Sequence, residues 1–329
     1  MAVDRDLAVA FVRAWAQVTH GHRSGWEVAA ATGVRALRLL REGGAFDRFV
    51  LTEANDVAAG VAARNAARCP GARVECRDGR TPPDGGPFDY VDIDPYGSPT
   101  PFVPSAFDAL ADAGVLAVTA TDMMVLAGVQ RGACERRYGG RPIRGRLGPE
   151  GGLRILLAYL AREARSRRRV IRPLLAYCRD HYVRAYVEVV PAPEGSTPDP
   201  VGTIDTGAWS GPPLGDRGPY GPLWLGPLFD RTLVGALTVP PAAARPRETA
   251  RLVTRLGEEV DADRPFYYES NRLARDLHLG RPAAVRGLLD ALRSRGFHAA
   301  RTHARPEGFR TDAPRAVVEA IARELSGAR

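Results

Sequence analysis

Residues 89–99 constrain the fold more than any other stretch, because a strand-forming run ends inside them at a defined point. Residues 90–93 are mostly apolar and favour a buried strand. Pro95 then removes a backbone donor, and Gly97 favours a turn. Asp94 is therefore expected at the carboxyl end of a strand, which is the edge of an open α/β sheet where ligands bind.

The tripeptide Asp94-Pro95-Tyr96 suits the binding of an exocyclic amine. The Asp94 carboxylate and a backbone carbonyl held by Pro95 can each accept an N–H, which leaves the nitrogen lone pair facing an electrophile. The Tyr96 ring can stack on the base that carries the amine. The alternative is a turn that ends a strand with a solvated aspartate, and these three residues alone do not decide between the two.

The first part of the chain alternates strands and helices. After an amphipathic helix over 4–18, a short strand at 26–30 leads through a small-residue turn to a helix over 34–41, as in nucleotide-binding βαβ units. The turn holds only Gly33, so it fails as a dinucleotide fingerprint. Arg35 lies in the first helical turn, where the helix dipole favours acids. It is either a surface residue or a partner for the carboxylate of a ligand.

Acidic residues follow three successive strands of this part. Glu53 lies twenty residues after Gly33, where an acid can accept two hydrogen bonds from a ribose diol. Asp78 can accept from an adenine amino group, and Asp94 ends the next strand. Three acids at one edge of a parallel sheet predict a cofactor that contains a nucleoside.

A basic segment follows the next strand, expected over 115–120. We expect a cap over the site at 123–129 and a loop over 131–150, before a helix over 151–166 and a strand over 183–190. Contact of the loop with a polyanion is favoured over a solvated face. Its six arginines are Arg131, Arg136, Arg137, Arg141, Arg144 and Arg146.

The length of 329 residues predicts two domains. We expect the first over 1–222, with an irregular insertion rich in Pro and Gly at 191–222, and the second over 223–329. The second reads as a smaller α+β, winged-helix-like, RNA-binding unit. Its elements are helices over 245–259, 267–278 and 282–295, a β-hairpin over 297–311 and a helix over 314–326. Four basic residues are expected on or beside the wing: Arg301, His303, Arg305 and Arg310.

The composition indicates an anionic partner and a reducing setting. The net charge is +8, and all 46 basic residues are Arg, whose planar fork suits phosphate oxygens; codon choice in a GC-rich genome is the alternative explanation. The four cysteines are scattered without a C-x-x-C pair, which argues against a zinc module or a disulfide framework. We see neither a signal peptide nor a transmembrane run and expect a cytoplasmic protein.

Seven sequence blocks resemble the tRNA guanosine-26 N2,N2-dimethyltransferases in their archaeal form, over nearly the whole chain. The most specific is the run from Asp94 to Pro99, together with the last two blocks. The blocks are residues 5–7, 31–35, 92–99, 118–122, 180–184, 221–226, and 301–303 with 311–314. The resemblance implies a Rossmann-like class I methyltransferase fold that uses S-adenosyl-L-methionine.

The resemblance also implies a role for particular residues. Arg5 and Arg35 would hold the methionine end of the cofactor, Glu53 the ribose, and Asp78 with Gly79 the adenine. Asp94 would be catalytic, accepting from the guanine N2 amine and taking or relaying its proton. Substrate contacts are expected from the residues beside it and from the basic side chains, namely Pro95, Tyr96, Arg144, Arg301, His303 and Arg310.

Three features depart from the family pattern. Met1 and Ala2 coincide with the middle of a family segment, so either the start lies earlier or part of the substrate pocket is lacking. No cysteine lies in 191–222, where many archaeal relatives carry a zinc-binding quartet, and we expect no metal. Glu53 stands where relatives commonly have Asp, a shorter arm.

Two other functions remain open from the sequence. The tripeptide Asp94-Pro95-Tyr96 is equally suited to methylation of an amine in another nucleic acid, such as adenine N6. The alternative from another functional class is a non-catalytic RNA-binding protein with a methyltransferase fold. The C-terminal basic unit and the blocks beyond residue 180 favour the tRNA enzyme.

Overall fold

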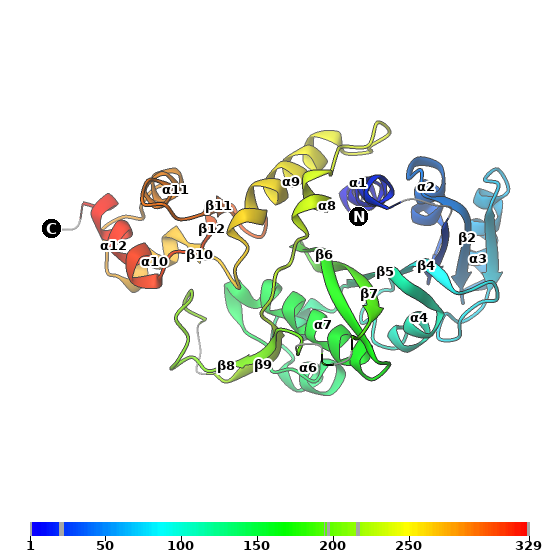
Figure 1. Ribbon diagram of the computed structural model, residues 1–329, viewed down its shortest axis with the longest axis horizontal. Helices are drawn as coiled ribbons and strands as arrows, with labels where there is room; N and C mark the ends of the chain where they lie inside the picture. The colour runs from blue at the N-terminus through cyan, green and yellow to red at the C-terminus, as the bar shows by residue number, and fades with distance from the viewer. Residues whose placement is uncertain (1, 20–22, 194, 196–197, 215–217, 328–329) are drawn as a thin grey trace.

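The computed structural model describes residues 2–19, 23–193, 195, 198–214 and 218–327. A seven-stranded sheet in the order β3-β2-β1-β4-β5-β7-β6 extends from the middle of the molecule to the end opposite the C-terminus (Figure 1). Strands β1 to β5 run parallel, whereas β7 is antiparallel to both β5 and β6. The strands are β1 (Arg23–Val28), β2 (Phe46–Glu53), β3 (Ala72–Cys76), β4 (Phe88–Ile93), β5 (Leu110–Ala120), β6 (Arg169–Arg179) and β7 (Tyr182–Pro191).

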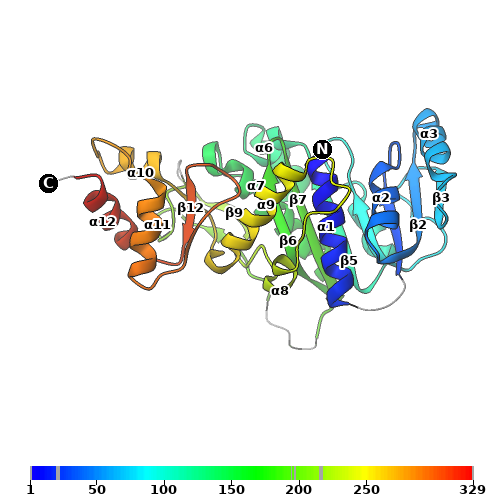
Figure 2. The same cartoon turned by 90° about the horizontal axis from the view of Figure 1, so that it is seen from above.

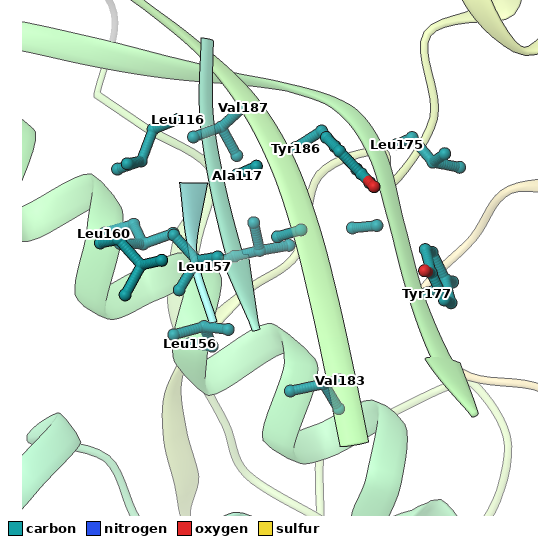
Figure 3. Packing of buried hydrophobic residues seen from close by; sticks show 14 of the residues in the cluster. Leu116, Ala117, Leu156, Leu157, Leu160, Leu175, Tyr177, Val183, Tyr186 and Val187 are labelled. Atoms are coloured by element: carbon teal, nitrogen blue, oxygen red, sulfur yellow. The ribbon is translucent and has the colours of Figure 1, made fainter. Parts of the chain in front are cut away.

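Helices cover both faces of this sheet, as buried parallel strands require. On one face, Phe11 of α1 stacks on Tyr186 of β7 with 4.0 Å between ring centroids. On the other face, Leu157 and Leu160 of α7 lie on the same side as Val187 (Figure 3). The helices of this part are α1 (Ala2–Val18), α2 (Val34–Glu42), α3 (Asp56–Ala66), α4 (Val103–Ala109), α5 (Met123–Leu126), α6 (Arg131–Tyr138), the 3-10 helix η1 (Gly145–Leu147) and α7 (Gly148–Arg165). The predicted α/β class is confirmed.

The remaining elements form two small sheets and further helices. The predicted hairpin is present, and a short third strand extends it to the order β10-β12-β11; this arrangement is compatible with the winged-helix-like prediction. The elements are β8 (Val201–Ile204), β9 (Tyr220–Trp224), α8 (Arg231–Gly235), α9 (Pro246–Glu259), the 3-10 helix η2 (Val260–Ala262), β10 (Tyr268–Glu269), α10 (Ser270–Asp276), α11 (Val285–Ser294), β11 (Ala299–Arg301), β12 (Gly308–Thr311) and α12 (Arg315–Leu325).

Three sequence predictions need correction. The basic segment 131–150 is not a loop, because it contains α6 and η1. Cys134 and Tyr138 lie four residues apart and are both buried, so they form the buried face of α6. The many arginines around them made this helical spacing hard to recognise in the sequence. The insertion 191–222 is not wholly irregular, since β8 pairs with β9; residues 194, 196–197 and 215–217 lie outside the described part. The helix expected over 267–278 starts only after β10.

Helix α9 ties the C-terminal part to α1, and the two helices lie side by side (Figure 2). Asp6 of α1 accepts hydrogen bonds from the backbone amides of Ala244 and Arg245, at 3.0 and 2.8 Å. One hydrophobic cluster extends from Val3 to Tyr267, and a second begins at Tyr268. The domain boundary at residue 222 stays a prediction. No helix in the described ranges has the length and apolar character needed to cross a membrane.

Candidate active site

A cavity of about 210 Å³ opens at the carboxyl ends of β1 and β4. The parallel register of these two strands brings the turn after β1 next to the residues that follow β4. Five of the predicted site residues meet there. The lining consists of Arg5, Glu27, Ala29, Ala30, Ala31, Thr32, Val34, Arg35, Asp94, Pro95, Tyr96 and Thr121.

Arg35 is a buried basic residue of this cavity that lies close to three acidic side chains. Its side chain is 5 % exposed, and Nη2 contacts both Asp94 and Asp4, the latter at 2.7 Å. Its Nε lies 3.6 Å from Oε1 of Glu27. The surface alternative for Arg35 is therefore wrong. Burial opposes its charge, but the neighbouring carboxylates hold the pKa of Arg35 well above its usual value.

The Nη1 atom of Arg35 is buried and has no hydrogen-bond partner among the described residues. A guanidinium nitrogen left unpaired in the interior is costly, so an acceptor is expected here. Because Arg35 lines the cavity, a carboxylate bound there would be such an acceptor; the predicted role of Arg35 in holding a ligand stays a prediction.

The turn that leads from β1 to α2 is held in an uncommon conformation. Ala29 and Ala31 have φ angles of 54° and 48°, in the left-handed region that non-glycine residues rarely adopt. Gly33 follows at 73°, where a Cβ would lie 2.6 Å from a methyl carbon of Leu51. The missing Cβ at Gly33 leaves room for Leu51 of β2, whereas Ala29, Ala30 and Ala31 line the cavity with small side chains.

Glu53 supports the same turn from the end of β2. Its Oε2 accepts from the amide of Ala31 at 2.7 Å, and its Oε1 accepts from the amide of Asn55 at 2.9 Å. Asn55 itself caps α3 by accepting from Ala58 at 2.9 Å. Glu53 thus lies beside the cavity without lining it, and its carboxylate keeps further acceptor capacity.

Asp78 and Gly79 lie at the neighbouring strand end, outside the cavity lining. The Asp78 carboxylate is 43 % exposed and pairs with Arg80. Gly79 approaches β1 so closely that a Cβ would lie 2.5 Å from Val28. Their predicted contact with an adenine stays a prediction.

Glu27 is a cavity residue that the sequence reasoning missed. It is 3 % exposed and accepts from the amide of Ala36 at 3.1 Å. Burial is the largest influence and raises the pKa of Glu27 to about 8; Arg35 opposes this rise, and Asp92 adds to it. An acid in the otherwise apolar run Trp26 to Val28 was the available signal.

A second buried arginine, Arg184 of β7, contacts β4. Arg184 of β7 contacts both carboxylate oxygens of Asp92, at 3.1 and 2.6 Å. It also lies 3.8 Å from Asp4, measured from Nε to Oδ1. The acids of β4 and α1 therefore share two buried arginines. Pairs of this kind are costly to break from one side.

Tyr96 projects from the turn after Asp94 with its side chain fully exposed. The turn is fixed behind it, because the amide of Gly97 donates to the Thr121 hydroxyl at 2.7 Å. A fully exposed aromatic ring beside a cavity offers a stacking surface for a base.

The predicted RNA contacts fall into two groups. Arg144 is exposed, and Arg301 is half-buried with its Nη1 donating to the carbonyl of Pro306 at 3.1 Å. The His303 and Arg310 side chains have no exposed surface and bond to Glu259. The burial of these two side chains argues against the predicted contact with RNA, which stays a prediction. Arg310 of β12 points into the interior toward Glu150 and Glu259, and His303, in the loop between β11 and β12, points toward Glu259.

Arg310 and His303 belong to a buried network that joins β12 and the loop before it to α7 and to Glu259 at the end of α9. Arg310 donates to both carboxylate oxygens of Glu150, each at 3.0 Å. Glu150 also accepts from Arg154 at 2.8 Å. The four cysteines are free thiols, and the described ranges contain no group of three or more His, Cys, Asp or Glu placed to bind a metal. The expectation of no metal stays a prediction.

The chain matches a family model described as N2,N2-dimethylguanosine tRNA methyltransferase over residues 1–197 and 215–323. The tRNA (guanine(26)-N(2))-dimethyltransferase of Thermococcus kodakarensis is 37% identical over 252 residues, which are 72% of this chain and 65% of the relative. The chain thus matches just under two thirds of the length of that relative. The enzyme of the same name from Pyrobaculum calidifontis is 30% identical over 334 residues, covering 99% of this chain and 90% of the relative.

A solved structure shares the whole arrangement. The complex of Trm1 from Pyrococcus horikoshii with S-adenosyl-L-methionine superposes with a TM-score of 0.86 at 29% identity. The match covers 98% of this chain and 92% of the other. The Rossmann-like methyltransferase fold expected from the sequence is confirmed.

Proposed function

We propose that this chain, which belongs to the N2,N2-dimethylguanosine tRNA methyltransferase family, methylates the exocyclic N2 of guanosine 26 in tRNA with S-adenosyl-L-methionine. The observation that carries the proposal is the meeting of Asp94, Pro95, Tyr96 and Arg35 at one cavity on the sheet edge. The curated relatives from Thermococcus kodakarensis and Pyrobaculum calidifontis bear the name of this activity.

The residues around the cavity fit S-adenosyl-L-methionine. The unpaired Nη1 of Arg35 suits its carboxylate, with Arg5 on the same lining. Glu53 would take the ribose, and Asp78 with Gly79 would take the adenine at the next strand end. When bound, the cofactor supplies an electrophilic methyl group on sulfur. The relative from Pyrococcus horikoshii was solved with this cofactor.

Asp94 would orient the nucleophile. One of its oxygens contacts Arg35, which leaves the other free to accept an N–H from the guanine amine. The backbone carbonyl of the rigid Asp94-Pro95 unit can accept the second N–H. Two acceptors on one amine direct the nitrogen lone pair toward the methyl donor, so that positioning carries much of the rate enhancement.

The proton that the amine loses after methylation needs an acceptor. Asp94 is the nearest candidate by this geometry, and its side chain is 14 % exposed, so it can pass the proton to solvent. Arg35 balances the carboxylate charge while the amine is bound. A second methylation would require the monomethylated amine to rotate in the same cavity.

The tRNA partner is also part of the proposal. A chain with a net charge of +8 should bind tRNA mainly through contacts between Arg and phosphate, and the affinity should fall steeply with salt. The guanine edge is stacked and paired in a folded tRNA, so the base has to leave its stack to reach the cavity. Tyr96 is placed to receive it. A cytoplasmic location, supported by the four free thiols, completes the proposal.

Methyl transfer to unmodified tRNA tests the proposal. The full chain would be incubated with radiolabelled S-adenosyl-L-methionine and either a tRNA transcript or the same transcript with adenosine at position 26. Mass spectrometry of the nucleosides should give N2-methylated guanosine from the first transcript only. Methylated adenosine would point to another amine substrate. Cofactor and tRNA binding without any transfer would point to a non-catalytic RNA-binding protein.

A further inference from the structure

A second cavity, of about 350 Å³, lies between η1, the segment 212–214 and the β10–α10 corner. Its volume is in the range of small-molecule sites. None of its lining residues lines the cavity at Asp94. The cavity therefore requires its own explanation.

Glu269 gives this cavity a specific polar group. Its side chain is 4 % exposed, and it accepts from Nη1 of Arg146 at 2.9 Å through Oε2. Its Oε1 is buried and has no hydrogen-bond partner in the described part of the chain. A buried carboxylate oxygen without a donor is costly. An N–H donor from a ligand would remove that cost.

The walls of the cavity combine apolar and basic surface. Leu147, Leu214 and Leu273 supply buried apolar side chains. Arg144, Arg146 and Arg272 also line it. Of these, Arg144 makes no ion pair with any described residue, whereas Arg272 is held by Asp276.

This combination selects one class of ligand. An apolar slot suits a flat ring, the free oxygen of Glu269 suits an N–H on the edge of that ring, and an unpaired Arg144 suits an anion. A nucleotide with an amino group on its base carries all three. A simple cation would be repelled by the arginines, and a simple anion would be repelled by Glu269.

We propose that this cavity binds one unpaired nucleotide of the tRNA, with a base that bears an exocyclic amine, apart from the nucleotide that is methylated. The proposal rests on the proposed function for the identity of the RNA. The base amine donates to Oε1 of Glu269, and the phosphate lies at Arg144. The cavity thus adds a contact that reads a base, beyond the contacts with phosphate that any RNA offers.

Arg144 connects this cavity to the segment that follows the catalytic strand end. A Cβ on Gly128 would lie 2.7 Å from Cγ of Arg144. Gly128 lies two residues after α5 and seven residues after Thr121, which lines the first cavity. A nucleotide held at Arg144 would therefore bind to a side chain that packs beside Gly128, in the segment that follows the catalytic cavity.

Cytidine and uridine 5′-monophosphate are the probes for this cavity. Cytidine presents a C4 amine donor beside an N3 acceptor, whereas uridine presents a single N3–H between two carbonyl oxygens that the carboxylate of Glu269 repels. Equilibrium dialysis with the full chain should give tighter binding of the cytidine nucleotide. In Glu269→Gln, the amide N–H₂ replaces the free oxygen and faces the donor of the base. We expect this variant to lose the preference and to bind the tRNA transcript about tenfold more weakly.

Arg146→Gln is the control that distinguishes loss of base recognition from loss of the ion pair between Arg146 and Glu269. It breaks the same ion pair as Glu269→Gln but leaves the carboxylate in place, so it should keep the preference for the cytidine nucleotide. Thermal melting and the dissociation constant of S-adenosyl-L-methionine confirm that both variants are folded. If both variants behave alike, the ion pair is structural and the proposal is overturned. Equal binding of both nucleotides by the unaltered chain overturns it as well.

The tRNA measurements distinguish this inference from the proposed function. Loss of tRNA affinity in Glu269→Gln, with no methylation by the unaltered chain, would support the cavity and contradict the methyltransferase assignment. Methylation by the unaltered chain with unchanged tRNA affinity in Glu269→Gln would support the methyltransferase assignment and overturn the proposal for this cavity. A preference for the cytidine nucleotide without an effect on tRNA would show a site for free nucleotides and overturn the assignment to RNA.

Discussion

Arg35 donates from Nη2 to Oδ2 of Asp4 across 2.7 Å, and both side chains are buried. The contact joins the first turn of α2 to the first turn of α1. Burial alone would raise the pKa of Asp4, but Arg35 and Arg184 lower it to about 2. Since Nη2 of Arg35 also contacts Asp94, the position of the proposed catalytic carboxylate depends on α1 as well as on β4.

Replacement of Asp94, the proposed catalytic carboxylate, should abolish most methyl transfer while sparing the cofactor site. Asp94→Asn keeps the shape of the side chain but removes the charge and one acceptor. We expect kcat on the tRNA transcript to fall roughly 10²- to 10⁴-fold, with the cofactor dissociation constant from calorimetry almost unchanged. Asp108→Asn, on the exposed surface of α4, is the matched control and should retain activity. Full turnover by Asp94→Asn would refute the role.

Tyr96 should matter for the substrate and not for stability. The side chain is fully exposed, so Tyr96→Ala should shift the free energy of unfolding by less than about 0.5 kcal/mol. Loss of base stacking, worth about 1–3 kcal/mol per base, should lower kcat/KM for tRNA roughly tenfold or more. Tyr96→Phe keeps the ring and should remain close to the unaltered chain. Equal losses in both variants would mean that the hydroxyl, and not stacking, is what counts.

The sheet and the cavity at Asp94 could be predicted because both follow from local rules. The spacing of apolar residues and the turn residues that follow them locate strands such as 90–93. Parallel strands then bring their carboxyl ends to the same edge of the sheet. Asp94 and Arg35 therefore meet although 58 residues lie between them in the chain. Glu27 escaped prediction because an acid inside an apolar strand marks an unusual position, but the sequence alone does not show that this position lines the cavity.

The C-terminal contacts could not be predicted from charge alone. Arg301 and Arg310 both lie on the hairpin, yet only Arg310 is buried. Its partner Glu150 is 160 residues away on α7, and no sequence pattern links the two. Basic residues in the 131–150 segment likewise hid the helical spacing of Cys134 and Tyr138.

The buried position of Arg310 predicts a large effect on stability. Arg310→Met would leave Glu150 and Glu259 without their shared partner, and removal of one side of a buried ion pair costs about 3–5 kcal/mol. Urea unfolding should show this loss. Arg301→Gln, on the same hairpin but half-buried, should stay within about 0.5 kcal/mol. If Arg310→Met instead keeps its stability and makes tRNA binding less dependent on salt, the residue contacts RNA after all.

Glu27 predicts a pH dependence whose sign follows from its raised pKa. Burial raises the pKa of Glu27 from 4.5 to about 8, so between these pH values the folded chain keeps a proton that the unfolded chain has lost. Unfolding then releases a proton, and this contribution to stability falls as pH rises, by at most about 1.4 kcal/mol per pH unit. Glu27→Gln cannot titrate, so its free energy of unfolding, measured in urea at pH 5, 6.5 and 8, should fall less steeply than that of the unaltered chain. Glu307→Gln, at an exposed turn of the hairpin, should keep the original slope. Identical slopes in all three proteins would mean that Glu27 is already ionised in the folded chain.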